Sequence, residues 1–72
     1  MEIRSRVGLN VKRAREAKGW SQEELADRSG LHRTYVSGVE RGIRNPTVTV
    51  LEKLAVALGL AAGRLLDDAK TS

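Results

Sequence analysis

Four glycines divide this chain of 72 residues into five segments that have the apolar periodicity of helices. The first four segments end at Gly19, Gly30, Gly42 and Gly59. Glycine commonly ends a helix because it adopts the left-handed backbone conformation at little steric cost. No segment shows the strict alternation of apolar and polar residues that is typical of a half-buried strand. The sequence therefore predicts an all-α fold, a compact bundle of five short helices.

Capping residues set the expected boundaries of these helices. Four of the predicted helices span residues 3–18, 22–28, 33–41 and 62–67. The remaining one, the fourth in the chain, begins after Thr47 or Thr49 and ends before Gly59. Ser21 and Glu24 form a capping box, in which each side chain accepts a hydrogen bond from the other residue's backbone amide. His32 is a poorer cap for the third helix. The domain is expected to cover residues 1–68, followed by a frayed tail at 69–72.

The apolar residues of the first and fourth helices predict a core and, on the fourth helix, apolar surface that the core does not use. In the first helix, Ile3, Val7 and Val11 lie on one face and are needed for the core. The fourth helix carries apolar residues in more than one direction, so part of its apolar surface is left for another partner. The predicted interface of a homodimer is formed by Val50, Val56, Leu60, Leu65 and Leu66.

Composition excludes several kinds of site. The chain has no cysteine and one histidine, so the sequence predicts no disulfide, no metal site and no cofactor. No apolar run approaches the roughly 20 residues of a membrane span, and the charged N-terminus lacks the apolar core of a signal peptide. The expected location is therefore the cytoplasm, without contact with a membrane.

The basic residues are concentrated in two parts of the chain, which has a net charge of +4. Residues 1–20 hold six basic and two acidic side chains, and residues 32–46 hold three basic and one acidic. Residues 21–31, between them, are net acidic. A basic stripe made by separated segments suits a polyanion, but a first helix with a merely solvated basic face explains the charge equally well.

Residues 22–41 have the spacing of two short helices joined by a tight turn. Two helices that cross steeply need a small residue where their axes approach, a glycine at the corner, and apolar contacts that hold the second helix on the first. These requirements are met by Leu25, Ala26, Gly30, Leu31, Val36 and Val39. The pattern predicts a helix-turn-helix.

From Val7-Gly8 to the Leu58-Gly59-Leu60 end of the fourth helix, the chain resembles the Cro/lambda-repressor-like helix-turn-helix family, also called the xenobiotic response element type. The resemblance implies a bundle of five helices that binds operator DNA, commonly as a dimer, with the third helix in the major groove. The stretches at 33–35 and 44–46 are similar to restriction-modification controller proteins.

Three positions depart from the family pattern. Ser29 replaces a residue that is often apolar, and His32 is an unusual cap, so both are expected to weaken their surroundings. Ala61 stands where the last helix usually begins with Ser or Thr, which implies that this helix is loosely held.

The third predicted helix has a polar face that suits DNA reading. Val36 and Val39 face the core, and Thr34, Ser37, Gly38 and Arg41 cluster on the opposite side. In a helix-turn-helix the first residues of the second helix reach base edges, so Arg33 and Thr34 are the first predicted base contacts, with Ser37 one turn further along. Arg33 suits guanine and the methyl group of Thr34 suits thymine. A salt bridge from Arg33 to an acid of the preceding helix is the structural alternative.

Several side chains around this face have two interpretations each. Tyr35 is a further predicted base contact, although packing of its ring in the core is the favoured alternative. Gly38 weakens the helix, and either close approach to DNA or a simple weak spot explains it. The predicted phosphate contacts are Gln22, Arg41, Arg44 and Asn45. Gln22 stands beside free amides at a helix start, and the resemblance assigns it this role. Lys12 and Arg13 are interpreted as part of a solvated face.

Arg15 and Glu40 each border the apolar face of their helix. In the resembling family, residues at these two positions form a largely buried ion pair that ties the first helix to the third. The implied role of the pair here is structural.

The leading hypothesis is a homodimeric, sequence-specific transcriptional regulator that binds a roughly palindromic operator in double-stranded DNA. A controller of a restriction-modification operon and an antitoxin-type autoregulator are alternatives within that class. A protein-interaction adaptor on the same fold is the alternative from another class, and the basic stripe argues against it. An enzyme is not expected, because Ser37 has no acid or base partner at a reachable spacing.

Overall fold

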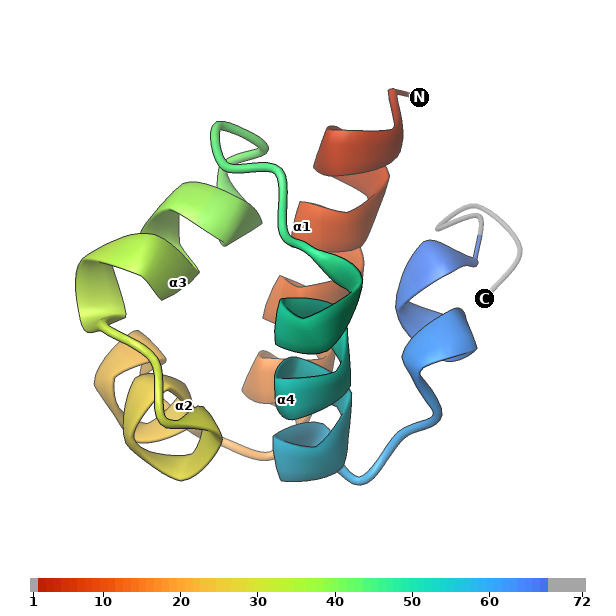
Figure 1. Cartoon of the computed structure of the whole chain (residues 1–72). Coiled ribbons are helices and arrows are strands. Elements are labelled where there is room, and N and C mark those ends of the chain that lie inside the picture. Colours follow the sequence, from red (N-terminus) through yellow and green to blue (C-terminus); the bar gives the residue numbers. More distant parts are fainter. Residues whose placement is uncertain (1, 68–72) are drawn as a thin grey trace.

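A computed structural model describes residues 2–67 of the chain, and this part is entirely helical, without strands. The elements are α1 (Ile3–Ala17), α2 (Gln22–Ser29), α3 (Arg33–Glu40), α4 (Val48–Leu58) and a short helix η1 (Ala62–Leu66), as Figure 1 shows. The all-α prediction is confirmed. The fifth element is a 3-10 helix, so the bundle consists of four α-helices and one tighter turn of helix. The predicted tail at 69–72 lies outside the described residues.

The helix starts follow the predicted caps, with one correction. The Ser21 hydroxyl accepts a hydrogen bond from the Glu24 amide at 3.0 Å, and Thr47 caps α4 through the Val50 amide at 3.2 Å. The second half of the predicted capping box is wrong. The Glu24 carboxylate instead accepts a hydrogen bond from Arg28 Nε at 2.6 Å, because a charged partner one turn away competes with the Ser21 amide.

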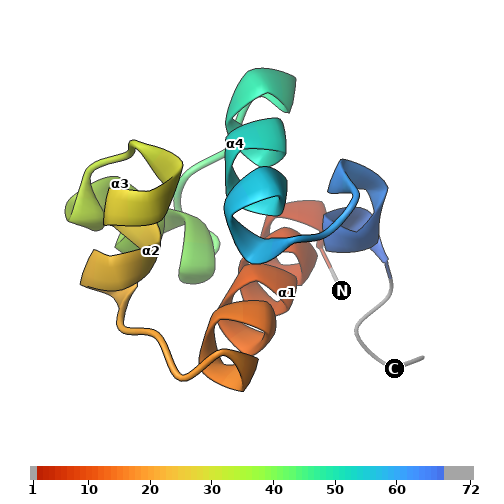
Figure 2. The same cartoon turned by 90° about the horizontal axis from the view of Figure 1, so that it is seen from below.

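The five helices pack around one core. α1 and α4 lie in the middle, with α2 and α3 on one side and η1 on the other (Figures 1 and 2). The core consists of buried side chains from every helix: Val7, Val11, Leu25, Ala26, Val36, Val39, Leu54, Ala55, Leu58 and Leu65. None of the helices in residues 2–67 is long and apolar enough to cross a bilayer.

Two apolar residues lie elsewhere than predicted. Ile3 is 47% exposed because the first turn of α1 extends past the core, so it is not the core residue that the periodicity indicated. Leu65 is fully buried, since it is the residue through which η1 packs onto α1 and α4. The prediction that Leu65 lies in a dimer interface is therefore wrong.

Hydrogen bonds from α1 hold η1 in place. Asn10 Nδ2 donates to the backbone oxygens of Leu65 at 2.9 Å and Asp67 at 2.7 Å. Ala61 provides no side-chain cap for η1, as the sequence suggested. The expectation of a loosely held last helix is nevertheless wrong, because Asn10 and the buried Leu65 side chain anchor it from the other side.

Ser29 does not weaken α2 as expected. Its side chain is buried, and its hydroxyl donates to the Leu25 carbonyl oxygen at 2.7 Å. A buried hydroxyl that has its hydrogen-bond partner carries little desolvation penalty.

The crossing of α1 and α3 depends on a glycine. Gly8 is buried, and a Cβ atom at this position would meet the backbone of α3, including the Glu40 carbonyl oxygen at 2.7 Å and the Val39 carbonyl oxygen. The two helices therefore approach more closely than any side chain at position 8 would permit. This contact fixes the position of α3 relative to the rest of the bundle.

Candidate nucleic-acid interface

α2, a three-residue turn and α3 form the predicted helix-turn-helix. Gly30 ends α2 with φ +73°, a left-handed conformation that glycine adopts without strain. The Leu31 amide then donates to the Ala26 carbonyl oxygen at 2.9 Å, which closes the corner. Ala26 is buried at the approach of the two helices, and Val36 and Val39 hold α3 against the core. The small residue, the glycine and the apolar pair are thus placed as the spacing predicted.

The face of α3 opposite Val36 and Val39 is polar and open. Arg33 and Thr34 are exposed in its first turn, and Ser37 is half-buried one turn later. Within residues 2–67, Arg33 forms no salt bridge, and Glu24 of α2 is paired with Arg28 instead. The alternative role of Arg33, a salt bridge to an acidic residue of α2, is therefore not observed in this part of the chain. Base contact by these three side chains stays a prediction.

Tyr35 lies at the edge of this face. Its ring is half-buried and packs against the core, in line with the favoured alternative. The Arg44 guanidinium carbon lies over the ring, 5.8 Å from its centre, within the range of a cation–π contact. Base contact by Tyr35 also remains a prediction.

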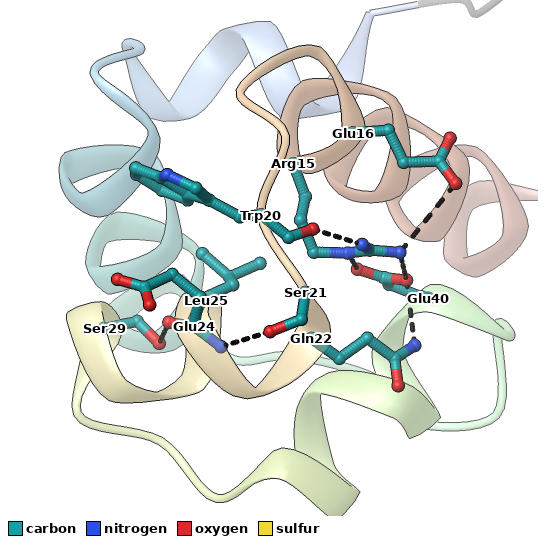
Figure 3. Close-up of polar contacts among 9 residues, drawn as sticks. All are labelled: Arg15, Glu16, Trp20, Ser21, Gln22, Glu24, Leu25, Ser29 and Glu40. Carbon is teal, nitrogen blue, oxygen red and sulfur yellow. Dashed lines mark hydrogen bonds and ion pairs between the residues drawn. The ribbon is translucent and has the colours of Figure 1, made fainter.

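A buried hydrogen-bond network joins α1, α2 and α3 (Figure 3). Arg15 Nε donates to Glu40 Oε2 at 2.7 Å and Arg15 Nη2 to Glu40 Oε1 at 3.0 Å, a two-point ion pair. Arg15 Nη1 donates to the Trp20 carbonyl oxygen at 2.7 Å. Only 11% of the Arg15 side chain and 3% of the Glu40 side chain are exposed. Hydrogen bonding to Glu40 raises the pKa of Arg15, and burial opposes part of this shift.

Gln22 belongs to the same network. Its Nε2 donates to Glu40 Oε1 at 3.0 Å, so one amide N–H points into the protein (Figure 3). Sequence reasoning missed this contact, because the proximity of residues 22 and 40 results from the packing of α2 against α3 and leaves no periodic signal. A carboxamide has two N–H donors, so phosphate contact by the second one stays a prediction.

Three further predicted phosphate contacts follow α3. Arg41 is the C-terminal cap of α3, and Arg41, Arg44 and Asn45 are all exposed. The structure thus brings them to the end of the polar face, in the connection between α3 and α4. Their contact with DNA remains a prediction.

Gly38 lies against another part of the same chain, and the interpretation that it is a weak spot in the helix stays a prediction. It is buried under the side chain of Arg44, and its carbonyl oxygen accepts from the Arg44 amide at 3.1 Å. The hypothesis that Gly38 serves close approach to DNA is therefore wrong, because a side chain of this same chain covers it.

Known proteins are similar to this chain in both sequence and fold. Residues 11–65 match the helix-turn-helix family. A "Neisseria hypothetical transcription factor" of Neisseria meningitidis serogroup B is 51% identical over 65 residues, which cover 90% of this chain and 61% of that protein. The restriction-modification controller protein C.AhdI from Aeromonas hydrophila has 47% sequence identity and a TM-score of 0.84, covering 86% of this chain and 94% of that one.

A further solved structure contains DNA. The biofilm master regulator SinR in complex with DNA has 37% sequence identity and a TM-score of 0.81, covering 85% of this chain and 98% of that chain. The residues that match the family include both helices of the motif and the helix that follows them. The chain belongs to the helix-turn-helix family, and its resemblance to the Cro/lambda-repressor-like type is confirmed.

Proposed function

We propose that this protein is a transcriptional regulator that binds a specific sequence in double-stranded DNA through α3. The observation that carries this proposal is the open polar face of α3, where Arg33 and Thr34 are exposed and unpaired within the described residues. The buried opposite face and the Gly8 crossing hold this helix at the surface of the bundle. The DNA-binding domain is proposed to span residues 1–68.

The similar proteins support this function. One is named a transcription factor, one is a restriction-modification controller, and one is a regulator whose structure contains DNA. Control of a restriction-modification operon is accordingly the proposed subclass, with an antitoxin-type autoregulator as its alternative. Because the similar proteins are regulators, we propose that the chain acts by binding and not by catalysis.

The proposed contacts divide into two sets. Arg33, Thr34, Ser37 and Tyr35 read base edges in the major groove. Gln22, Arg41, Arg44 and Asn45 hold phosphates and fix the register of the protein on the duplex. The buried Arg15–Glu40 pair keeps α1 and α3 in place behind both sets.

The recognition proposal predicts a loss of affinity at one position of the site. Arg33→Ala should weaken binding by about 1 to 3 kcal/mol at one base pair in each half-site, because the bidentate contact with guanine is removed. Competition binding between single-base variants of a duplex selected from random sequences measures this loss. Arg64→Ala removes the same charge from η1, on the side of the bundle away from α3, and is the matched control. Equal losses for the two variants would contradict base reading by Arg33.

The operator symmetry that we propose requires a dimer. Val56 is 68% exposed on α4 and Leu66 is exposed on η1. Val50, on α4, and Leu60, in the connection between α4 and η1, are half-buried. Of the two helices, η1 lies on the side of the bundle away from α2, and α4 lies between η1 and α2. We propose that a second copy of the chain covers the surface formed by these residues, so that both α3 helices face successive major grooves about 34 Å apart.

A charge in this surface should break the dimer. Val56→Glu is expected to shift sedimentation equilibrium toward the monomer, because an ionised carboxylate does not tolerate burial in an apolar interface. Ile43→Glu introduces the same charge at an exposed apolar residue of the α3–α4 connection and should leave the equilibrium unchanged. A wild-type protein that remains monomeric at high concentration, with and without DNA, would contradict the dimer.

A further inference from the structure

The chain that follows α3 folds back onto the outer side of that helix. The Gly38 carbonyl oxygen accepts hydrogen bonds from the amides of Ile43 at 2.9 Å and Arg44 at 3.1 Å. These bonds place the backbone of Arg44 beside the middle of α3. The position of the Arg44 side chain is therefore set by contacts with α3, although Arg44 belongs to an irregular connection.

The Arg44 side chain occupies the space that a side chain at position 38 would need. A Cβ atom on Gly38 would lie 2.5 Å from Arg44 Cγ and 3.6 Å from both Arg44 Cβ and Arg44 Cδ. The methylene chain of Arg44 thus lies directly across the bare backbone of α3. Beyond it, the guanidinium carbon lies 5.8 Å from the centre of the Tyr35 ring.

This arrangement places the methylene chain of Arg44 beside the polar face of α3 and its guanidinium over Tyr35. At about 100° per residue on a helical wheel, Gly38 lies about 40° from Thr34 and about 60° from Tyr35. Gly38 therefore lies between the face proposed to read bases and the Tyr35 ring, over which the Arg44 guanidinium lies. An arginine that lies across Gly38 follows the border of that face.

We propose that Gly38 is a positioning residue for DNA binding, which acts by letting Arg44 lie on α3 and extend its guanidinium over Tyr35 toward the DNA. The inference rests on the function proposed above. Its physical basis is preorganisation, because an arginine already held in one arrangement loses less rotamer entropy on contact with DNA. Gly38 itself does not contact the DNA and acts only through Arg44.

The test separates fold stability from affinity. Gly38→Ala should stay folded with a melting temperature close to that of the wild type, because the helix propensity that alanine gains opposes the cost of moving Arg44 Cγ, an atom near the fixed end of its side chain. The same variant and Arg44→Ala should each bind a duplex selected from random sequences about tenfold more weakly than the wild type. The magnitude of the negative slope of log K against log salt should fall by about 0.9 in both variants, because each loses one phosphate contact.

A double variant provides the decisive comparison. Once Arg44 is alanine, its Cγ atom is absent, so Gly38→Ala should change the affinity of the Arg44→Ala protein by less than twofold. Gly63→Ala is the matched control, since Gly63 lies in η1 with open space around its Cα and should bind as the wild type does. In nuclear magnetic resonance spectra, the ring-current shift of the Arg44 side-chain protons by Tyr35 should disappear in Gly38→Ala without DNA.

Three results would overturn the proposal. Wild-type affinity of Gly38→Ala alongside a weakened Arg44→Ala would show that Arg44 does not need the glycine. A loss of equal size in the wild-type and Arg44→Ala backgrounds would show that Gly38 acts by another route. An unchanged ring-current shift would contradict the displacement itself. Failure of the wild type to select any duplex would instead contradict the proposed function, and the spectra separate these two failures.

Discussion

Replacing Glu40 by alanine is expected to lower the free energy of unfolding by about 3 kcal/mol, because the substitution leaves a buried guanidinium without its partner. Glu40 accepts two hydrogen bonds from Arg15 and one from Gln22. In its absence, Arg15 keeps the Trp20 carbonyl oxygen and a distant, exposed Glu16 carboxylate at 4.0 Å. A core from so short a chain supplies about 3 to 5 kcal/mol in total, so a loss of this size would unfold much of the protein.

Urea denaturation followed by circular dichroism measures this loss. Glu52→Ala is the matched control, since Glu52 is exposed on α4, and its effect should stay within about 0.5 kcal/mol. Replacement of both partners, Arg15→Met with Glu40→Leu, should recover part of the lost stability, because no charge is left buried while the Trp20 carbonyl oxygen and the Gln22 amide lose a hydrogen bond. A loss below about 0.5 kcal/mol for Glu40→Ala would contradict the structural role of the pair.

Gly8→Ala is expected to destabilise the fold by at least about 2 kcal/mol, although alanine is the better helix former. The added Cβ atom would meet the Val39 and Glu40 carbonyl groups, which belong to the backbone of α3 and cannot rotate away. The substitution would therefore push α1 away from α3 and loosen the Arg15–Glu40 pair that spans the same two helices.

The matched control for Gly8→Ala is Gly63→Ala, where nothing lies near the added atom. The midpoint of urea denaturation should fall for the first variant and change little for the second. A Gly8→Ala protein as stable as the wild type would contradict the close crossing of α1 and α3.

The local parts of this fold could be predicted from the sequence because local chemistry determines them. Ser21 and Thr47 cap their helices, and Gly30 ends α2 in the left-handed conformation that its position requires. The helix-turn-helix followed for the same reason, since its small residue, its corner glycine and its apolar contacts lie within twenty residues of one another.

Contacts between distant residues could not be predicted in the same way. Helical periodicity left Leu65 available for a partner, but the return of η1 to α1 and α4 buries it. The Gln22 contact with Glu40 and the Arg44 contact with Gly38 depend on how separate segments pack, which no spacing within one helix encodes. Glu24 shows a local failure, where two acceptable hydrogen-bond donors compete and the charged one prevails.

Selection of bound sequences from a pool of random duplexes tests the central claim most directly, with the affinity of the recovered sites then measured at several salt concentrations. We expect a roughly palindromic site whose half-sites are about one helical turn apart, and an affinity well above that for unrelated duplexes at every salt concentration. Equally weak binding to all sequences, with one common steep salt dependence, would contradict sequence recognition by α3 and leave only non-specific attraction to the DNA backbone.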